Sequence, residues 1–275
     1  MWMCVQCRSR ANRVILGTAT IQGELWGKAA RDWAEIQEPM NKPLWEAMQN
    51  AAQVGPGTCF LDVGCGGGGA SLIAAEKGAQ VSGLDAAEGL ITFARERMPD
   101  GNFRVGDMEN LPFDDDAFDV VFAANSVQFA GDWIAALREL GRVCAPGGRI
   151  VAGLFGPPER VGFRVIFKAI EDIMPEPPPS GGPFALSPPG KLEELFAQAG
   201  LNMLGSDEVD CPYSYPDFET FWRGTTAAGP FQSILRVVSE ERLKLAMREA
   251  VKPFRCDNSG ILIQPNIFKY VVATL

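Results

Sequence analysis

Short apolar runs alternate with amphipathic segments over residues 58–156. The apolar runs predict strands at 58–64, 80–86, 102–108, 118–126 and 149–156. Between the strands, apolar residues recur at helical spacing and predict helices at 69–77, 87–98 and 132–143. Because strand and helix alternate for about 100 residues, we expect a parallel sheet covered by helices on both faces.

Two regions flank this alternating core. Residues 21–52 are predicted to be helical. After the fifth strand, helices are predicted at 161–174 and 191–200, a sixth strand at 202–211, two or three helices within 216–251 and a last strand at 267–275. The proline-rich stretch 175–189 excludes regular structure, since proline removes backbone donors. We interpret 212–264 as an insertion between the last two strands of the sheet.

A glycine cluster follows the first predicted strand. Gly64, Gly66 and Gly69 fit the dinucleotide pattern G-x-G-x-x-G, which is a weak signal when it stands alone. Asp62 lies two residues before the first glycine, where a carboxylate opposes a diphosphate and suits a cation. S-adenosylmethionine (SAM) carries a sulfonium and an ammonium but no phosphate. The glycines allow the backbone to approach its amino-acid portion closely.

The next two predicted strands also end in acids, at intervals of about 22 residues. Asp85 ends the second strand, where a carboxylate accepts hydrogen bonds from ribose hydroxyls. Asp107 ends the third, where a carboxylate accepts from the exocyclic amine of adenine and Met108 lies against the ring. Each acid alone is also explained as a helix cap. The set of three, together with the glycine cluster, favours SAM.

With these motifs the chain resembles the class I SAM-dependent methyltransferases, in their ubiquinone/menaquinone-biosynthesis-type small-molecule branch. The resemblance runs from Trp26 to about Gly156. It is carried by LDVGCGGG (61–68), SGLDAAEGLI (82–91), GDMENLPFDDDAFDVV (106–121), NSVQFAGDW (125–133) and RVCAPGGRI (142–150). It implies an α/β, Rossmann-like, seven-stranded sheet that is mostly parallel with the last strand antiparallel. It also implies a helical lid over residues 1–52 and a SAM-binding domain over 53–275.

The resemblance assigns roles to particular residues. It implies that the cofactor contacts Asp62, Gly64, Cys65, Gly66, Asp85, Ala86, Asp107, Met108, Asn125, Ser126 and Trp33. Trp26 and Trp33 are lid residues in this reading, although core-facing aromatics on an amphipathic helix explain them equally well. For the acceptor, Gln128 and Phe129 face the expected transfer site. Independently of the resemblance, aromatic residues are expected to provide the remaining acceptor contacts, although ordinary core packing explains each at least as well: Trp26, Phe155, Phe184, Phe221 and Trp222.

Composition narrows the function further. A net charge of −9 and a pI of about 4.7 argue against a nucleic-acid or anionic-membrane partner, and we expect a cytoplasmic monomer or homodimer. No stretch has the roughly 18 apolar residues of a membrane span, and residues 1–10 lack the apolar core of a secretion signal. Seven cysteines, an odd number, indicate reduced thiols. Cys4 and Cys7 form a single C-x-x-C, which favours a frayed tail over a metal site.

The sequence contains no histidine, which excludes an imidazole base or ligand. We expect no bound metal, because Asp114–Asp116 has the character of a solvated turn. Three routes for the acceptor proton stay open: an acceptor that loses it readily, proximity alone, or a base among Glu38, Asp210, Tyr213 and Tyr215. Gln128, Glu38, Tyr213 and Tyr215 are the candidate catalytic residues.

The sequence thus favours a SAM-dependent methyltransferase that uses in-line transfer without a histidine base. Its acceptor is expected to be a small, largely apolar or aromatic organic molecule, such as a secondary metabolite, with S-adenosylhomocysteine (SAH) as the second product. One alternative is a SAM-binding protein of the same fold with a non-methylating role, such as a cyclase or a non-catalytic partner. Another is a nicotinamide dehydrogenase, against which Asp62 argues.

Overall fold

A seven-stranded sheet forms the centre of the computed structural model, which describes residues 18–175, 182–256 and 260–275. The strand order is β3-β2-β1-β4-β5-β9-β6, and β9 runs antiparallel to both of its neighbours. This confirms the Rossmann-like sheet with an antiparallel last strand. The strands are β1 (Cys59–Val63), β2 (Gln80–Asp85), β3 (Asn102–Val105), β4 (Phe118–Ala124), β5 (Cys144–Phe155), β6 (Asn202–Asp210) and β9 (Ile267–Thr274).

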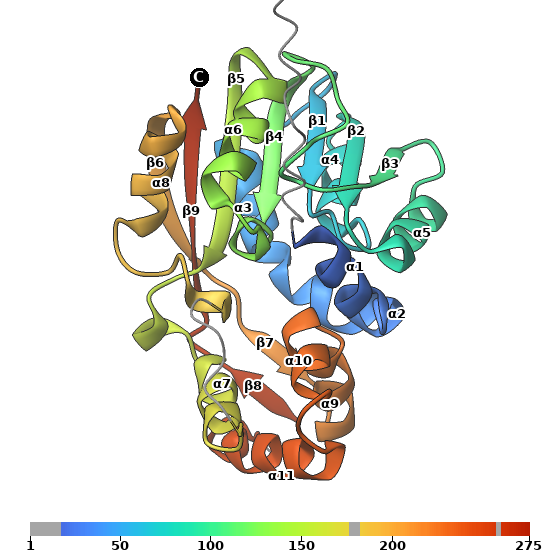
Figure 1. The fold of residues 1–275 in the computed structure, drawn as a ribbon, viewed down its shortest axis with the longest axis vertical. Helices are drawn as coiled ribbons and strands as arrows, with labels where there is room; N and C mark the ends of the chain where they lie inside the picture. The colour runs from blue at the N-terminus through green and yellow to red at the C-terminus, as the bar shows by residue number, and fades with distance from the viewer. Residues whose placement is uncertain (1–17, 176–181, 257–259) are drawn as a thin grey trace, which may run out of the picture.

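Helices cover both faces of this sheet (Figure 1). Within β1, Phe60 faces the side of α3 (Lys42–Ala51) and α4 (Gly69–Glu76), whereas its neighbour Leu61 faces the side of α6 (Trp133–Val143) and α8 (Lys191–Ala199). In β4, Phe122 faces the side of α3 and α4, and Val121 faces the side of α6 and α8. This two-residue alternation of buried side chains explains why the apolar runs form strands buried on both faces. The helices are α1 (Ala19–Gly27), α2 (Ala30–Asp32), α3 (Lys42–Ala51), α4 (Gly69–Glu76), α5 (Glu88–Arg97), α6 (Trp133–Val143), α7 (Arg164–Glu171), α8 (Lys191–Ala199), α9 (Phe218–Thr226), α10 (Gly229–Ile234) and α11 (Glu240–Ala250).

The predicted boundaries differ most from the structure at β5 and α7. β5 begins at Cys144 rather than at 149, because residues 145–148 form an irregular stretch inside the strand. Gly147 adopts a φ of +79° there, and the pairing with β4 resumes at Arg149. α7 is shorter than predicted and covers only Arg164–Glu171.

A second, two-stranded sheet was missed by the sequence pattern. It pairs β7 (Tyr213–Tyr215) with β8 (Ile261–Ile263) in antiparallel fashion, with Tyr213 opposite Ile263. Three-residue strands are too short for a period of two to be recognised. The sheet lies with α7, α9, α10 and α11 at the end of the molecule toward which the arrows of β1 and β4 point (Figure 1).

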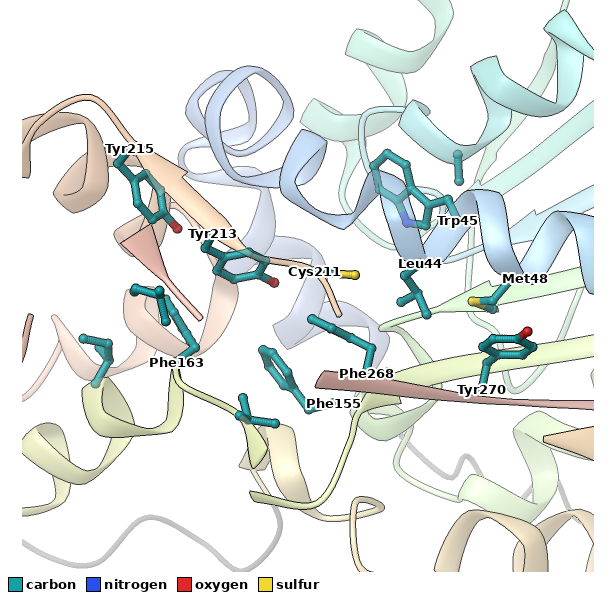
Figure 2. Close-up of a cluster of buried hydrophobic side chains, with 14 of the residues drawn as sticks. Leu44, Trp45, Met48, Phe155, Phe163, Cys211, Tyr213, Tyr215, Phe268 and Tyr270 are labelled. Carbon is teal, nitrogen blue, oxygen red and sulfur yellow. The ribbon is translucent and has the colours of Figure 1, made fainter. Parts of the chain in front are cut away.

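One apolar cluster joins the main sheet to the segment between β6 and β9. The Phe155 ring at the end of β5 lies 4.6 Å from the Phe268 ring of β9, centroid to centroid. Phe163, which precedes α7, stacks near Phe155 and makes an edge contact with Tyr213 of β7 at 5.3 Å. Figure 2 shows these rings in one continuous layer that also includes Leu44 and Met48 of α3. The segment between β6 and β9 therefore shares its core with the main sheet.

The N-terminal turns pack between these two halves (Figure 1). α1 contacts both α5 and α10. It is followed by a π-helical turn (Trp33–Gln37) and a 3-10 helix (Glu38–Asn41) that lead into α3. Two glycines make the approach close: a Cβ on Gly23 would lie 2.3 Å from the Ala86 carbonyl oxygen, and one on Gly229 would lie 2.5 Å from the Trp26 indole nitrogen. Among the described residues, none of the helices is long and apolar enough to cross a membrane.

Candidate functional site

A cavity with about 870 Å³ of empty space opens at the carboxyl ends of β1, β2 and β4, beneath α1. Parallel sheets place ligands at this edge. All eleven residues expected to hold the cofactor line this first cavity: Trp33, Asp62, Gly64, Cys65, Gly66, Asp85, Ala86, Asp107, Met108, Asn125 and Ser126. Their contact with a cofactor stays a prediction.

The glycine turn has a backbone that side chains disfavour. Gly64, Gly66 and Gly68 have φ values of +77°, +56° and +82°. A Cβ on Gly64 would also lie 2.3 Å from the Cβ of Ser126, whose hydroxyl donates to the Val63 carbonyl at 2.7 Å. The turn therefore brings bare backbone to the cavity.

Asp62, on β1, is 2% exposed, and its Oδ2 accepts a hydrogen bond from the Ser71 hydroxyl at 2.7 Å. Burial is the main cause that raises the pKa of Asp62 to about 7, and the nearby Asp85 carboxylate adds to it, against the opposing hydrogen bond from Ser71. A cation that binds beside Asp62 stabilises the ionised carboxylate that burial disfavours, so this position favours a positively charged ligand.

Asp85 ends β2 and ties the glycine turn to the next helix. Its Oδ2 accepts from the Gly66 backbone N–H and its Oδ1 from that of Ala87, both at 2.9 Å. Burial raises the pKa of Asp85, while these backbone hydrogen bonds lower it. Asp107, after β3, accepts from the Glu109 N–H at 2.9 Å and lies beside Met108 on the same wall.

Glu38 reaches the first cavity from the N-terminal 3-10 helix. Its Oε1 accepts from the Gly69 N–H at 2.8 Å, which supplies the start of α4 with a cap that the adjacent Gly68 does not provide. Its Oε2 is buried without a hydrogen-bond partner. Burial raises the pKa of Glu38 to about 8, although the Gly69 hydrogen bond and the charge of Arg97, 3.8 Å away, both lower it.

The electrostatic character of the first cavity follows from this set. Four carboxylates line it, from Glu38, Asp62, Asp85 and Asp107. No lysine or arginine is among the described residues of its wall. Such a wall repels a diphosphate and suits a ligand that carries ammonium or sulfonium groups.

A second cavity, with about 530 Å³ of empty space, adjoins the first. Five residues line both cavities: Trp26, Trp33, Asn41, Asn125 and Phe129. Trp26 makes edge contacts with Trp33 and Phe129, with ring centroids 4.6 and 5.4 Å away. Apolar side chains form most of the remaining wall: Phe155, Phe163, Phe167, Pro183, Ala228, Pro230 and Phe231. Its other polar residues are Gln37, Gln128, Tyr213 and Thr225.

The candidate catalytic residues separate in space. Gln128 and Tyr213 line the second cavity, Glu38 lines only the first, and Tyr215 lines neither. The hydroxyl of Tyr213 donates to Asn41 Oδ1 at 2.9 Å, and that of Tyr215 donates to Gln37 Oε1 at 2.7 Å. Burial raises the pKa of both tyrosines well above the usual range, so they suit a donor role better than that of a base. Asp210 is exposed and accepts from the Asn266 N–H.

Four of the predicted acceptor residues line the second cavity, namely Trp26, Gln128, Phe129 and Phe155. The other three do not. Phe221 is fully buried against Tyr215, Trp222 lies under the Lys244 ammonium, and Phe184 packs behind Phe155 and Phe167. A sequence indicates that these rings are apolar but not which helix face reaches the cavity.

Several lining residues were not anticipated: Gln37, Asn41, Phe163 and Phe167. Asn41 is the most connected, since Asn125 Nδ2 also approaches its Oδ1, at 3.4 Å. No local motif marks these residues, because packing between distant segments brings them together.

The acidic run before β4 lies at the surface. Asp114, Asp115 and Asp116 are exposed, and Asp115 pairs with Arg142 at 2.7 Å. Across the described ranges, no group of three or more Cys, Asp or Glu side chains is arranged to hold a metal ion. Cys4 and Cys7 lie outside the described residues.

Comparison with known proteins adds independent information. The family described as "Methyltransferase domain" matches residues 61–152. A malonyl-[acyl-carrier protein] O-methyltransferase of Serratia marcescens is 38% identical over 112 residues, which cover 41% of this chain and 44% of that protein. A demethylmenaquinone methyltransferase of Bacillus subtilis is 34% identical over 128 residues, covering 43% and 55%. The matched part of this chain thus spans about half the length of these curated relatives.

A solved structure shares the fold over nearly the whole chain. It is a geranyl diphosphate C-methyltransferase of Streptomyces coelicolor A3(2), in complex with Mg2+, geranyl diphosphate and S-adenosyl-L-homocysteine. The similarity has a TM-score of 0.54 at 17% identity and covers 93% of this chain and 97% of the other. At this identity the similarity shows the fold alone.

Proposed function

This chain contains a class I SAM-dependent methyltransferase domain, and from that premise we propose that the protein transfers a methyl group from SAM to a small organic acceptor. SAM occupies the first cavity and the acceptor the second. The observation that carries the proposal is the pair of adjoining cavities, of which the first has an acidic wall and the second an aromatic one. SAM is the methyl donor that the family employs, and it supplies a methyl group on a positively charged sulfur.

The residues of the first cavity fit this ligand. The Oε2 of Glu38, which has no hydrogen-bond partner and only the Arg97 guanidinium 3.8 Å away, and the carboxylate of Asp62 suit an ammonium group beside the bare glycine turn. Asp85 retains free lone pairs for ribose hydroxyls, and Asp107 with Met108 suits adenine. Trp26, Trp33 and Phe129 line both cavities and exclude water where the two ligands meet.

The described residues of the second cavity include no group suited to take a proton at neutral pH. None of the described residues that line the second cavity carries a carboxylate, and the sequence has no histidine. Burial raises the pKa of Tyr213, the one titratable residue among them, well above its usual value. We therefore infer that alignment of the acceptor supplies most of the rate, and that the acceptor releases its own proton readily, as a phenol does. The substrates named for the two relatives differ in charge, since a malonyl group ends in a carboxylate whereas a demethylmenaquinone is apolar. The aromatic wall of the second cavity suits an apolar acceptor better than a charged one.

The activity is tested by incubating the full chain with SAM and a panel of hydroxylated aromatic compounds. We expect SAH and an acceptor heavier by one methylene, formed in equal amounts. SAM that binds tightly but is not consumed with any member of the panel would favour a non-methylating role instead. Heat on titration with NAD but not with SAM would contradict both.

We further propose that the N-terminal segment, residues 1–52, acts as a lid whose α1 must pack closely over the first cavity. Gly23→Ala is expected to weaken SAM binding roughly 5- to 100-fold, because its Cβ would collide with the Ala86 carbonyl. Gly27→Ala is the matched control in the same helix, since its Cβ would meet only the Ala87 Cβ at 4.0 Å. Isothermal titration calorimetry measures both; equal affinities for the two variants would contradict the packing argument.

A further inference from the structure

We propose, resting on the function above, that the second cavity selects an uncharged hydroxylated aromatic acceptor, whose hydroxyl groups donate to the free oxygens of Asn125, Gln128 and Thr225. The wall of this cavity has buried oxygens without hydrogen-bond partners, an asparagine amide whose orientation is fixed by its neighbours, and no ionised side chain among its described residues.

The wall of the second cavity holds three buried oxygens that have no hydrogen-bond partner. They are Asn125 Oδ1, Gln128 Oε1 and Thr225 Oγ1. Gln128 is 8% exposed and Thr225 1%, so water does not freely satisfy them. Among the described residues only six buried side-chain nitrogen or oxygen atoms are unpartnered, and half of them lie on residues of this wall. Because an unpaired buried polar atom is costly, such a group points to a ligand that completes it.

The orientation of the Asn125 amide follows from its neighbours. Tyr213 donates to Asn41 Oδ1, and Asn41 Nδ2 donates to the Glu38 carbonyl oxygen at 3.3 Å. Asn41 therefore presents an acceptor to Asn125, which places the Nδ2 group of Asn125 toward it at 3.4 Å. The oxygen of Asn125 is then left for the ligand, so the ligand must bring a donor. Asn125 lines both cavities, and its φ of +55° is a backbone conformation that asparagine adopts more readily than most side chains.

The second cavity favours an uncharged acceptor, because its described wall has no lysine, arginine, aspartate or glutamate. Of the described residues that line the second cavity, Tyr213 alone is titratable, and burial keeps it neutral at ordinary pH. A carboxylate or phosphate placed there would lose its hydration without gaining a cation. The rings of Phe155, Phe163, Phe167 and Phe231 offer instead a surface for a flat apolar body.

The position of Asn125 indicates which hydroxyl of the acceptor receives the methyl group. Because this residue lines both cavities, the hydroxyl that donates to it is the one nearest the methyl donor. Transfer forms an oxygen–carbon bond at that hydroxyl and breaks the carbon–sulfur bond, whose electron pair stays on sulfur, while the hydroxyl proton passes to solvent. The ether that results has no hydrogen to donate, so Asn125 loses its partner and the product binds more weakly than the acceptor.

The test uses the full chain saturated with SAH and three naphthalenes that share one ring system. Calorimetry is expected to show binding of a dihydroxynaphthalene, at least 10-fold weaker binding of its dimethoxy counterpart, and no binding of a naphthalene dicarboxylate. Gln128→Met and Thr225→Val should each reduce the preference for the dihydroxy compound by roughly 5-fold, while SAM affinity stays unchanged because neither residue lines the first cavity. Unchanged SAM affinity also reports an intact fold.

The outcomes separate this inference from the proposed function. Equal affinity for the dimethoxy compound, or tighter binding of the dicarboxylate, would overturn the inference. Turnover of a charged acceptor would do the same while supporting methyl transfer. Selective binding of the dihydroxy compound without SAH formation from SAM would support the inference and count against the function.

Discussion

Replacing Asp62 with asparagine is expected to weaken SAM binding roughly 10- to 100-fold, because a hydrogen bond to a charged group is worth about 1.5–3 kcal/mol. The fold should persist, since the asparagine oxygen can still accept the bond that Ser71 donates to Asp62 Oδ2. The loss arises from charge alone: the carboxylate faces the glycine turn in a cavity whose described wall has no cation of its own. Isothermal titration calorimetry with SAM measures the affinity of both proteins.

Asp114→Asn is the matched control for this substitution. It removes the same charge from the chain, but Asp114 is exposed in the loop before β4. Its SAM affinity should equal that of the unmodified protein. If Asp62→Asn bound SAM as tightly as this control, the electrostatic basis of cofactor selection would be wrong.

Glu38→Gln is expected to make the ligand-free protein more heat-stable at pH 8 than the unmodified protein, by several degrees, and to leave the two equal near pH 4. Burial raises the folded-state pKa of Glu38 to about 8, above the ordinary value of 4.5. A carboxyl group with a raised folded-state pKa contributes stability that is complete below pH 4.5 and is lost as the pH rises through 8. The glutamine side chain does not ionise, so the variant keeps its stability as the pH rises. Its amide oxygen can still accept the hydrogen bond from the Gly69 N–H.

Thermal unfolding between pH 4 and pH 9 measures this difference in melting temperature. The control is Glu35→Gln, which removes an exposed carboxylate from the same N-terminal segment and should show no pH-dependent difference. Saturating SAM should reverse the order at pH 8, because a bound cation stabilises the ionised Glu38 but not the glutamine. A stability difference that does not depend on pH would show that Glu38 serves only as the cap of α4.

The first cavity was predictable because its residues lie close to the ends of strands. In a parallel sheet the topology alone brings Asp62, Asp85 and Asp107 to one edge, so spacing along the chain translates into position in space. The strands themselves were predictable for a related reason, since β1 and β4 are buried on both faces and stand out as apolar runs.

The second cavity was only partly predictable, because it forms between segments that are distant in sequence. The hydrogen bond between Tyr213 and Asn41 joins residues 172 positions apart, and no local pattern encodes such a pair. Phe221 and Trp222 show the converse difficulty. Both are apolar, as a cavity wall requires, yet their face of α9 packs into the core, where large rings are equally favoured.

The short sheet of β7 and β8 has a consequence for the helices that lie between its two strands. β7 follows β6 almost at once and β8 shortly precedes β9, so the pairing of Tyr213 with Ile263 closes the intervening chain at its base. The entropy of closing a loop grows only slowly with its length, and here the ends are already held together. The enclosed helices are therefore held at their base independently of their own sequence. Substitutions on the sides of these helices that line the second cavity are expected to change which acceptor binds, provided that the core they share with the main sheet is kept.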